Sequence, residues 1–190
     1  MSETPTRRIN FRAFKVLCRE MSTYEDLNTL FNDLVELICR SFEVKACAIL
    51  LYDERVQELF HVATYGISDE YLSKGPIPFR LEDNPLKKGE AICIDDMSRD
   101  QRILYPEAAK LEGFKVMLCF PIFCRKDIIG MIRVYHHESL QLAEYDMDSF
   151  AVLNRLLGLV IEHHGMKNFI DAVKSSFSSL PLRMLEGLGS

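Results

Sequence analysis

The sequence predicts an α+β fold: an antiparallel sheet of five to six strands, with long helices on one face and loops and short helices on the other. Three observations support this. Two apolar runs, 116–123 and 128–135, are separated only by a short polar turn. Helical periodicity flanks the strand-like regions at both ends of the chain. The segment 66–112 between the strand-like regions is punctuated by Gly and Pro, which is typical of a loop-rich layer.

The first part of the chain has the periodicity of two helices. Residues 1–22 predict an amphipathic helix. A second helix is indicated by apolar residues that recur at steps of three and four up to Phe42. Ser22 and Glu25 have the spacing of a capping box, so we expect the second helix to start there. The apolar seam of the first helix consists of Phe11, Phe14, Cys18 and Met21.

Strand-like runs follow. Residues 45–52 and 57–65 surround the polar sequence Asp53-Glu54-Arg55, and this pattern predicts a hairpin that Gly66 ends. Within the irregular region, residues 91–95 predict a short strand. Residues 105–113 predict a short helix that a glycine closes.

The run from Val116 to Tyr135 predicts a second hairpin that is buried on both faces. Alternate residues of a strand point to opposite sides, and in 116–123 both sets are apolar. Ile128, Ile132 and Val134 continue one set in the partner strand. Pro121 cannot donate a hydrogen bond to a neighbouring strand, so it predicts a bulge or an unpaired position. We expect helices over one face and the 66–112 segment over the other, with room for a pocket beneath that segment.

Residues 144–164 predict a long helix, and a heptad-like seam follows it. Gly165 interrupts, kinks or simply continues this helix, and the sequence leaves the three open. We divide the chain into an N-terminal helix (1–22), a central domain (23–165) and a C-terminal helix with a short tail (166–190). Seams at both ends favour a helical bundle, formed within one molecule or across a homodimer. The C-terminal seam comprises Met166, Ile170, Val173, Phe177 and Leu180.

Composition narrows the class of protein. A net charge of −5 over 190 residues argues against a nucleic-acid partner. No apolar run approaches the roughly 18 residues that span a bilayer, so we expect no membrane insertion. Six cysteines without CxxC spacing are typical of reduced thiols, and the first ten residues lack the apolar core of a secretion signal. These features predict a cytoplasmic protein.

The order of elements and two local sequences resemble the GAF domain family over residues 24–164. GFKVMLCFPIFCRKDIIGMIRVYHHE (113–138) is similar to the family's final hairpin, and AICIDDMSRDQR (91–102) to its preceding strand. The resemblance implies a PAS-related fold with a small-molecule pocket between the sheet and the 66–112 segment. The candidate ligand-binding residues are Phe79, Asp95, Asp96, Arg102, Tyr105, Phe120, Arg133 and Tyr135.

Arg133 is the most informative candidate, because a guanidinium within an apolar strand needs a partner. One hypothesis is a structural ion pair with Asp95 or Asp96. The alternatives are a carboxylate or phosphate of a ligand, or solvent.

Specialised members of the family fit the sequence less well. Free methionine-(R)-sulfoxide reductases carry several thiols in these loops, whereas only Cys93 lies between Gly66 and Lys115. Bilin-carrying members attach the pigment near the short helix, and residues 102–113 contain no cysteine. The dispersed residue set of cyclic-nucleotide-binding members does not occur in order. A redox sensor that uses Cys93, Cys119 or Cys124 is an alternative to three buried thiols that only pack.

Histidines and a basic stripe complete the candidates. His136-His137 and His163-His164 are adjacent pairs, which do not readily chelate a metal alone, so we predict no metal site. Haem ligation by His61 would require it to face the pocket. A basic stripe on the first helix suits an acidic partner, lipid head groups or nucleic acid, or is simply a solvated face. This stripe comprises Arg8, Arg12, Lys15 and Arg19.

The sequence therefore predicts a GAF-like sensory or regulatory module, not an enzyme, since no catalytic motif is present. A small molecule of unknown identity would bind in the pocket. The terminal helices would pass the signal to an unidentified downstream protein. One alternative is a dimerising structural module with a vestigial pocket. Another is a thiol-based redox sensor or methionine-sulfoxide reductase.

Overall fold

The computed structural model describes residues 11–79, 85–140 and 142–178. It contains one six-stranded sheet, in the order β3-β2-β1-β6-β5-β4, and every neighbouring pair of strands is antiparallel. The strands are β1 (Ala46–Asp53), β2 (Glu58–Tyr65), β3 (Ile77–Pro78), β4 (Ile92–Ile94), β5 (Val116–Cys124) and β6 (Asp127–His136). The predicted α+β class and the two hairpins are confirmed.

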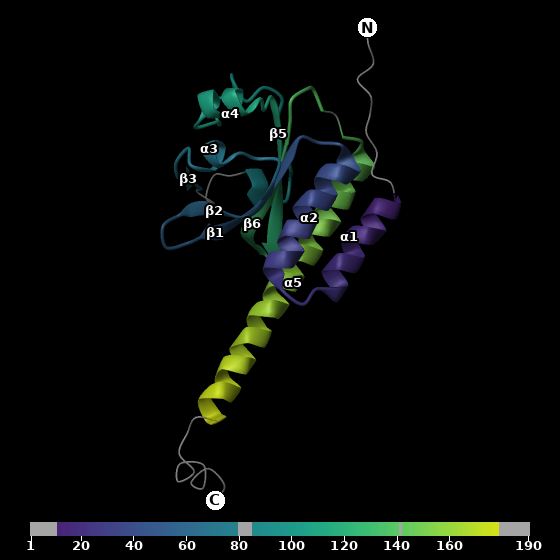
Figure 1. Cartoon of the computed structure of the whole chain (residues 1–190), viewed down its shortest axis with the longest axis vertical. Helices are drawn as coiled ribbons and strands as arrows, with labels where there is room; N and C mark the ends of the chain where they lie inside the picture. Colours follow the sequence, from purple (N-terminus) through teal and green to yellow (C-terminus); the bar gives the residue numbers. More distant parts are fainter. Residues whose placement is uncertain (1–10, 80–84, 141, 179–190) are drawn as a thin grey trace, which may run out of the picture.

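Three long helices lie on one side of this sheet (Figure 1). Helices α2 (Leu27–Phe42) and α5 (Glu144–Ser178) pack on the strands, and α1 (Phe11–Thr23) packs on these two helices. The other face carries α3 (Asp69–Leu72), the 3-10 turn η1 (Pro85–Lys88) and α4 (Pro106–Glu112). The two ends of the chain thus supply one layer, and the irregular middle segment supplies the other.

Each face of the sheet has its own hydrophobic core, and β5 contributes to both. Leu118 and Phe120 lie in the cluster beneath α2 and α5, whereas Met117 and Cys119 lie in the cluster beneath the irregular segment. The predicted burial of both faces is confirmed. Ile128 is an exception, because it belongs to the loop-side cluster and not to that of Ile132. A register shift at Ile122/Phe123 reverses its side relative to the simple alternation.

The start of α2 differs from the prediction. Ser22 still belongs to α1, where its hydroxyl donates to the carbonyl oxygen of Arg19 at 2.8 Å. Asp26 is the N-cap, and its carboxylate accepts the backbone N–H of Thr29 at 2.8 Å. A capping box at Ser22 and Glu25 is therefore wrong, because the chain needs three residues to turn between α1 and α2.

The closing helix α5 runs without a break through Gly165, so the expected boundary between residues 165 and 166 falls inside one helix. Its first half lies on the sheet, and its second half extends beyond the body of the domain (Figure 1). The seam residue Leu180 and the basic residue Arg8 lie outside the described residues. No helix within the described ranges has the length and apolar character needed to cross a bilayer.

Candidate functional site

A cavity of about 380 Å³ lies between the sheet and the irregular segment. This volume is within the roughly 300–1,000 Å³ typical of small-molecule sites. Strands β3 to β6 supply its floor and sides, and the segments around α3 and before α4 close it. It is lined by Tyr71, Lys74, Ile77, Pro78, Phe79, Leu86, Ile92, Ile94, Met97, Arg102, Ile103, Leu104, Tyr105, Met117, Cys119, Met131 and Arg133. Four predicted residues, Phe79, Arg102, Tyr105 and Arg133, therefore share one cavity.

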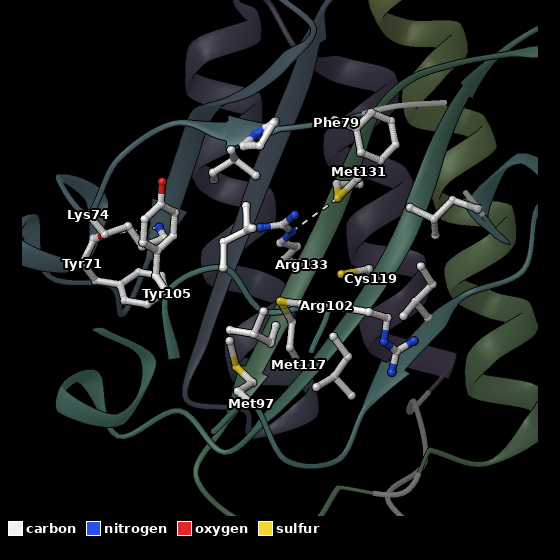
Figure 2. A pocket seen from close by; sticks show the side chains of 17 residues that line it. Tyr71, Lys74, Phe79, Met97, Arg102, Tyr105, Met117, Cys119, Met131 and Arg133 are labelled. Atoms are coloured by element: carbon white, nitrogen blue, oxygen red, sulfur yellow. Dashed lines mark hydrogen bonds between the residues drawn. The ribbon is translucent and has the colours of Figure 1, made fainter. Parts of the chain in front are cut away.

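Arg133 occupies the floor of the cavity. In the sheet it stands between Ala48 of β1 and Cys119 of β5. Figure 2 shows its guanidinium among the lining side chains, with Lys74 and Tyr71 on one side and Cys119 on the other. Its Nε donates to the thioether sulfur of Met131 at 3.3 Å, and a thioether is only a weak acceptor. Among the described residues, no carboxylate lies within ion-pair distance of Arg133.

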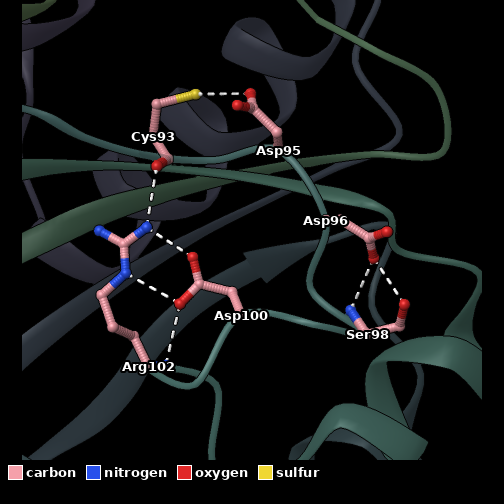
Figure 3. Close-up of polar contacts among 6 residues, drawn as sticks. All are labelled: Cys93, Asp95, Asp96, Ser98, Asp100 and Arg102. Atoms are coloured by element: carbon pink, nitrogen blue, oxygen red, sulfur yellow. Dashed lines mark hydrogen bonds and ion pairs between the residues drawn. The ribbon is translucent and has the colours of Figure 1, made fainter.

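The ion pair expected between Arg133 and Asp95 or Asp96 is therefore wrong, because both carboxylates bind elsewhere (Figure 3). Asp95 accepts a hydrogen bond from the thiol of Cys93 at 3.4 Å. Asp96 accepts the backbone N–H and the hydroxyl of Ser98, and these bonds lower the pKa of Asp96. Neither aspartate lines the cavity.

Arg102 also lines the cavity, but its charge is already matched. Its Nε and one terminal nitrogen donate to the two carboxylate oxygens of Asp100, at 2.9 and 2.5 Å. These bonds lower the pKa of Asp100 to about 2. A further contact to the carbonyl oxygen of Cys93 ties the arginine to β4 at 3.3 Å. Arg102 therefore closes the loop that follows β4.

Tyr105 connects two segments at the side of the cavity. Its hydroxyl donates to the carbonyl oxygen of Pro76 at 2.8 Å. Gly75 lies directly under this ring: its φ is +129°, and a Cβ would lie only 2.6 Å from the Tyr105 hydroxyl. Only glycine suits that position.

Besides Asp95 and Asp96, two further predicted ligand-binding residues do not line the cavity. Phe120 faces the helical layer and stacks on Phe150 of α5, with ring centroids 4.2 Å apart. It fails as a wall residue because it has the opposite strand parity to Met117 and Cys119. Tyr135 has the correct parity but stacks on Phe114 at 4.5 Å behind the cavity, and its side chain is fully buried.

Sequence reasoning missed Tyr71 and Lys74, which lie in and just after the short helix α3. The Lys74 ammonium sits 3.8 Å above the centroid of the Tyr71 ring and donates to the Tyr71 carbonyl oxygen at 3.0 Å. Burial and the positive charge of Arg133 lower the pKa of Lys74 to about 8, although Glu112 opposes this. Burial, with Tyr135 nearby, raises the pKa of Tyr71. The capping pattern Ser68-Asp69-Glu70 was a signal that could have located this helix.

His61 of β2 belongs to the same charged neighbourhood without lining the cavity. Burial, together with the charges of Lys74 and Arg133, lowers its pKa to about 4. Its Nε2 atom is buried and has no hydrogen-bond partner among the described residues. Three basic side chains thus meet at this end of the floor.

The three candidate redox thiols are separated in the fold. Cys119 lines the cavity, Cys93 is exposed on β4, and Cys124 ends β5. Burial raises the pKa of all three, that of Cys93 to about 11, where Asp95 adds to the effect. A raised pKa suppresses the thiolate that redox chemistry requires.

The histidine pairs lie away from the cavity. His136 is the last residue of β6, so His137 lies outside the strand. The two side chains therefore do not point to opposite faces as expected, and their ring centroids lie 4.4 Å apart. Together with Glu138 they could offer three ligand atoms within 4.8 Å of one another, although His137 and Glu138 are exposed.

A second groove, between α1 and α5, is lined in part by Met21, Leu159 and His163.

The fold thus combines an antiparallel sheet, helices from both ends of the chain on one face, and a cavity under a loop layer on the other. A sequence model of the GAF domain matches residues 26–161, and the chain belongs to the GAF domain family. No curated protein matches the chain significantly.

Many solved structures share this fold, and the following three are distant in sequence. The GAF domain of a phosphoenolpyruvate-protein phosphotransferase from Coxiella burnetii has a TM-score of 0.71 at 19% identity, covering 83% of this chain and 95% of that one. Its Acinetobacter counterpart has a TM-score of 0.66 at 18% identity, covering 88% and 99%. Free methionine-R-sulfoxide reductase from Neisseria meningitidis has a TM-score of 0.64 at 17% identity, covering 85% and 96%. At these identities the likeness establishes the fold alone.

Proposed function

We propose that this GAF domain is a sensory or regulatory module that binds a small molecule in the cavity between the sheet and the irregular segment. The observation that carries the proposal is the cavity itself, whose floor is apolar except for the guanidinium of Arg133. An apolar enclosure with a few convergent polar groups is the usual form of a ligand site. GAF domains are typically small-molecule-binding regulatory modules, which supports the same conclusion.

The route from the cavity to the helices would run through β5. Met117 and Cys119 face the cavity. Phe120, the next residue along β5, points to the other face and stacks on Phe150 of α5. A ligand that displaces β5 therefore also displaces a residue on which α5 rests. Such a ligand shifts the position of α5 only if it binds one helix arrangement more tightly than the other.

The projecting half of α5 would carry the output and join two copies of the chain. The C-terminal half of α5 extends beyond the sheet (Figure 1). The spacing of Met166 and Ile170 continues in the sequence to Val173 and Phe177, the heptad-like pattern of a two-helix seam. We therefore propose a homodimer through the terminal helices, acting on a downstream protein. The exposed apolar residues of this half include Met166, Phe169 and Ile170.

Native mass spectrometry of the protein as purified from cells tests the binding proposal. Leu104 is 57% exposed at the edge of the cavity, so Leu104→Trp narrows the cavity with little effect on the core. Leu111→Trp is the matched control, because Leu111 is 90% exposed and lies outside the cavity lining. We expect a bound small molecule in the wild type and in Leu111→Trp, and its loss in Leu104→Trp. Bare protein in all three favours the structural module with a vestigial pocket.

The thiol-based alternative has less support. The raised pKa values of Cys93, Cys119 and Cys124 leave little thiolate at neutral pH. Peroxide treatment of a variant with serine at these three positions tests it: a response in the wild type that the variant lacks would revive the redox hypothesis.

A further inference from the structure

The cavity carries positive charge that the described residues do not neutralise. Among the described residues, the charged side chains that line it are those of Lys74, Arg102 and Arg133, and none of the described lining residues is Asp or Glu. Arg102 is paired with Asp100. Lys74 and Arg133 have no ion-pair partner within the described ranges. Two of the three cationic side chains therefore face the cavity with no described carboxylate at ion-pair distance.

The surroundings of these two cations make their charge costly. Arg133 lies in a sheet core with Cys119 and Ala48 as cross-strand neighbours. Lys74 has a pKa lowered to about 8, and His61 nearby has a pKa lowered to about 4; burial is the largest cause in both, and the positive charge of Arg133 adds to it. A partly desolvated charge without a partner destabilises the fold that contains it. An anion in the cavity would offset the positive charge of both Lys74 and Arg133.

We propose that the occupant of the cavity is a small organic anion, whose carboxylate or phosphate group binds the guanidinium of Arg133 beside Lys74. This inference rests on the proposed function of the cavity. Only the Nε–H of the planar guanidinium donates to the sulfur of Met131, so its terminal N–H groups can bind a ligand. Two parallel N–H groups suit two oxygens of a carboxylate or phosphate. The apolar body of the ligand lies against Met97, Met117 and Met131, whose flexible side chains adapt to different shapes.

The competing explanation is that Arg133 has a structural role, and the two make opposite predictions for the empty protein. If Arg133 held the sheet together, Arg133→Gln would lower the melting temperature. If Arg133 is kept for an anion, the same change removes an uncompensated charge and raises the melting temperature of ligand-free protein by about 2–4 °C. Arg99→Gln is the control, because the Arg99 side chain is 87% exposed and lies outside the cavity lining.

Binding is tested with four probes of one shape and different charge: phenylacetate, phenyl phosphate, phenylacetamide and phenethylammonium. Calorimetry of the full chain, freed of any bound molecule, gives the affinity of each. We expect at least one of the two anions to bind about tenfold or more tightly than the neutral amide and the cation. In Arg133→Gln this preference disappears, whereas in Arg99→Gln it persists. The tighter of the two anions identifies the head group as carboxylate or phosphate.

The inference is overturned if the amide or the cation binds as tightly as the anions, or if Arg133→Gln keeps the anion preference. If none of the probes binds, the molecule detected by native mass spectrometry decides, and a neutral or cationic molecule overturns the inference. If neither the probes nor a cellular molecule binds, the proposed function itself fails. Failure of the proposed function and failure of the anion preference therefore give different experimental results.

Discussion

Gly158 of α5 lies against the backbone of Phe123 at the end of β5, so closely that a Cβ on the glycine would come within 2.7 Å of the Phe123 carbonyl carbon. The closing helix therefore rests on the sheet backbone-to-backbone at this point. One turn further along α5, Glu162 forms an ion pair with Arg125 of the turn between β5 and β6 at 2.8 Å. The C-terminal half of the helix extends beyond the sheet (Figure 1). The contact between Gly158 and Phe123 fixes the height of the helix above the strand that borders the cavity.

Two glycines in the same helix provide a matched test of that contact. We expect Gly158→Ala to lower the free energy of unfolding by roughly 1–3 kcal/mol, because the added methyl group meets backbone that cannot move aside. Gly165→Ala has open space around it and should raise the free energy of unfolding by about 0.5–1 kcal/mol through better helix propensity. Urea denaturation measures both. Equal effects of the two changes would contradict the close approach.

The amine of Lys74 should titrate far below an ordinary lysine. Its neighbours are Tyr71 on α3, His61 on β2, Glu112 on α4 and Arg133 on β6. Since burial and Arg133 both disfavour the proton, we expect a pKa near 8 in ligand-free protein, measured by NMR of ¹³C-methylated lysines. Arg133→Gln removes a repelling charge and should raise the pKa of Lys74 toward 10.5, whereas Arg99→Gln should leave it unchanged.

The sign of the accompanying stability effect follows from the same shift. Between pH 8 and about 10.5 the unfolded chain holds a proton on Lys74 that the folded chain has lost. The contribution of Lys74 therefore opposes folding fully below pH 8 and fades as the pH rises toward 10.5. A pKa of Lys74 close to 10.5 in the wild type would mean that the charge cluster is solvated.

The apolar surface of the projecting part of α5 should control assembly. Phe169 is 70% exposed and Ile170 is 50% exposed. We expect Phe169→Glu or Ile170→Glu to weaken a homodimer about tenfold or more, because each places a charge in the proposed seam. Light scattering after size exclusion measures the mass. Leu111→Glu, on α4, is the control and should leave the mass unchanged; a monomeric wild type would contradict the dimer.

Strand parity explains how much of the fold could be predicted. Alternation in 116–123 correctly predicted a ribbon buried on both faces, but it did not show which set of residues faces the cavity. Phe120 was expected there, whereas Met117 and Cys119 line it. Alternation failed at Ile128, because the register shift beside Phe123 involves no residue type that announces it. The local sequence pattern predicts which residues of a strand share a face. The position of a bulge also depends on the partner strand, so the local pattern does not predict it.

The site was predicted less completely than the fold, for the same physical reason. Arg133 was found because a charge in an apolar strand is conspicuous within its own segment. The prediction of an aspartate partner for Arg133 was wrong. Asp96 accepts hydrogen bonds from Ser98, and Asp95 accepts one from Cys93, each only two residues away in the chain. Lys74 was missed because it follows a four-residue helix, and nothing local connects it with β6. Long-range pairings of this kind appear only once the chain is folded.

Methyl NMR of the methionines tests most directly whether the cavity holds a small molecule. Met97, Met117 and Met131 line the cavity, whereas Met21 lines the groove between α1 and α5. The ligand-free protein is mixed with the low-molecular-mass fraction of a cell extract. We predict that the resonances of Met97, Met117 and Met131 shift and that the resonance of Met21 does not. A shift confined to Met21, or no shift at any of the four, would contradict the account.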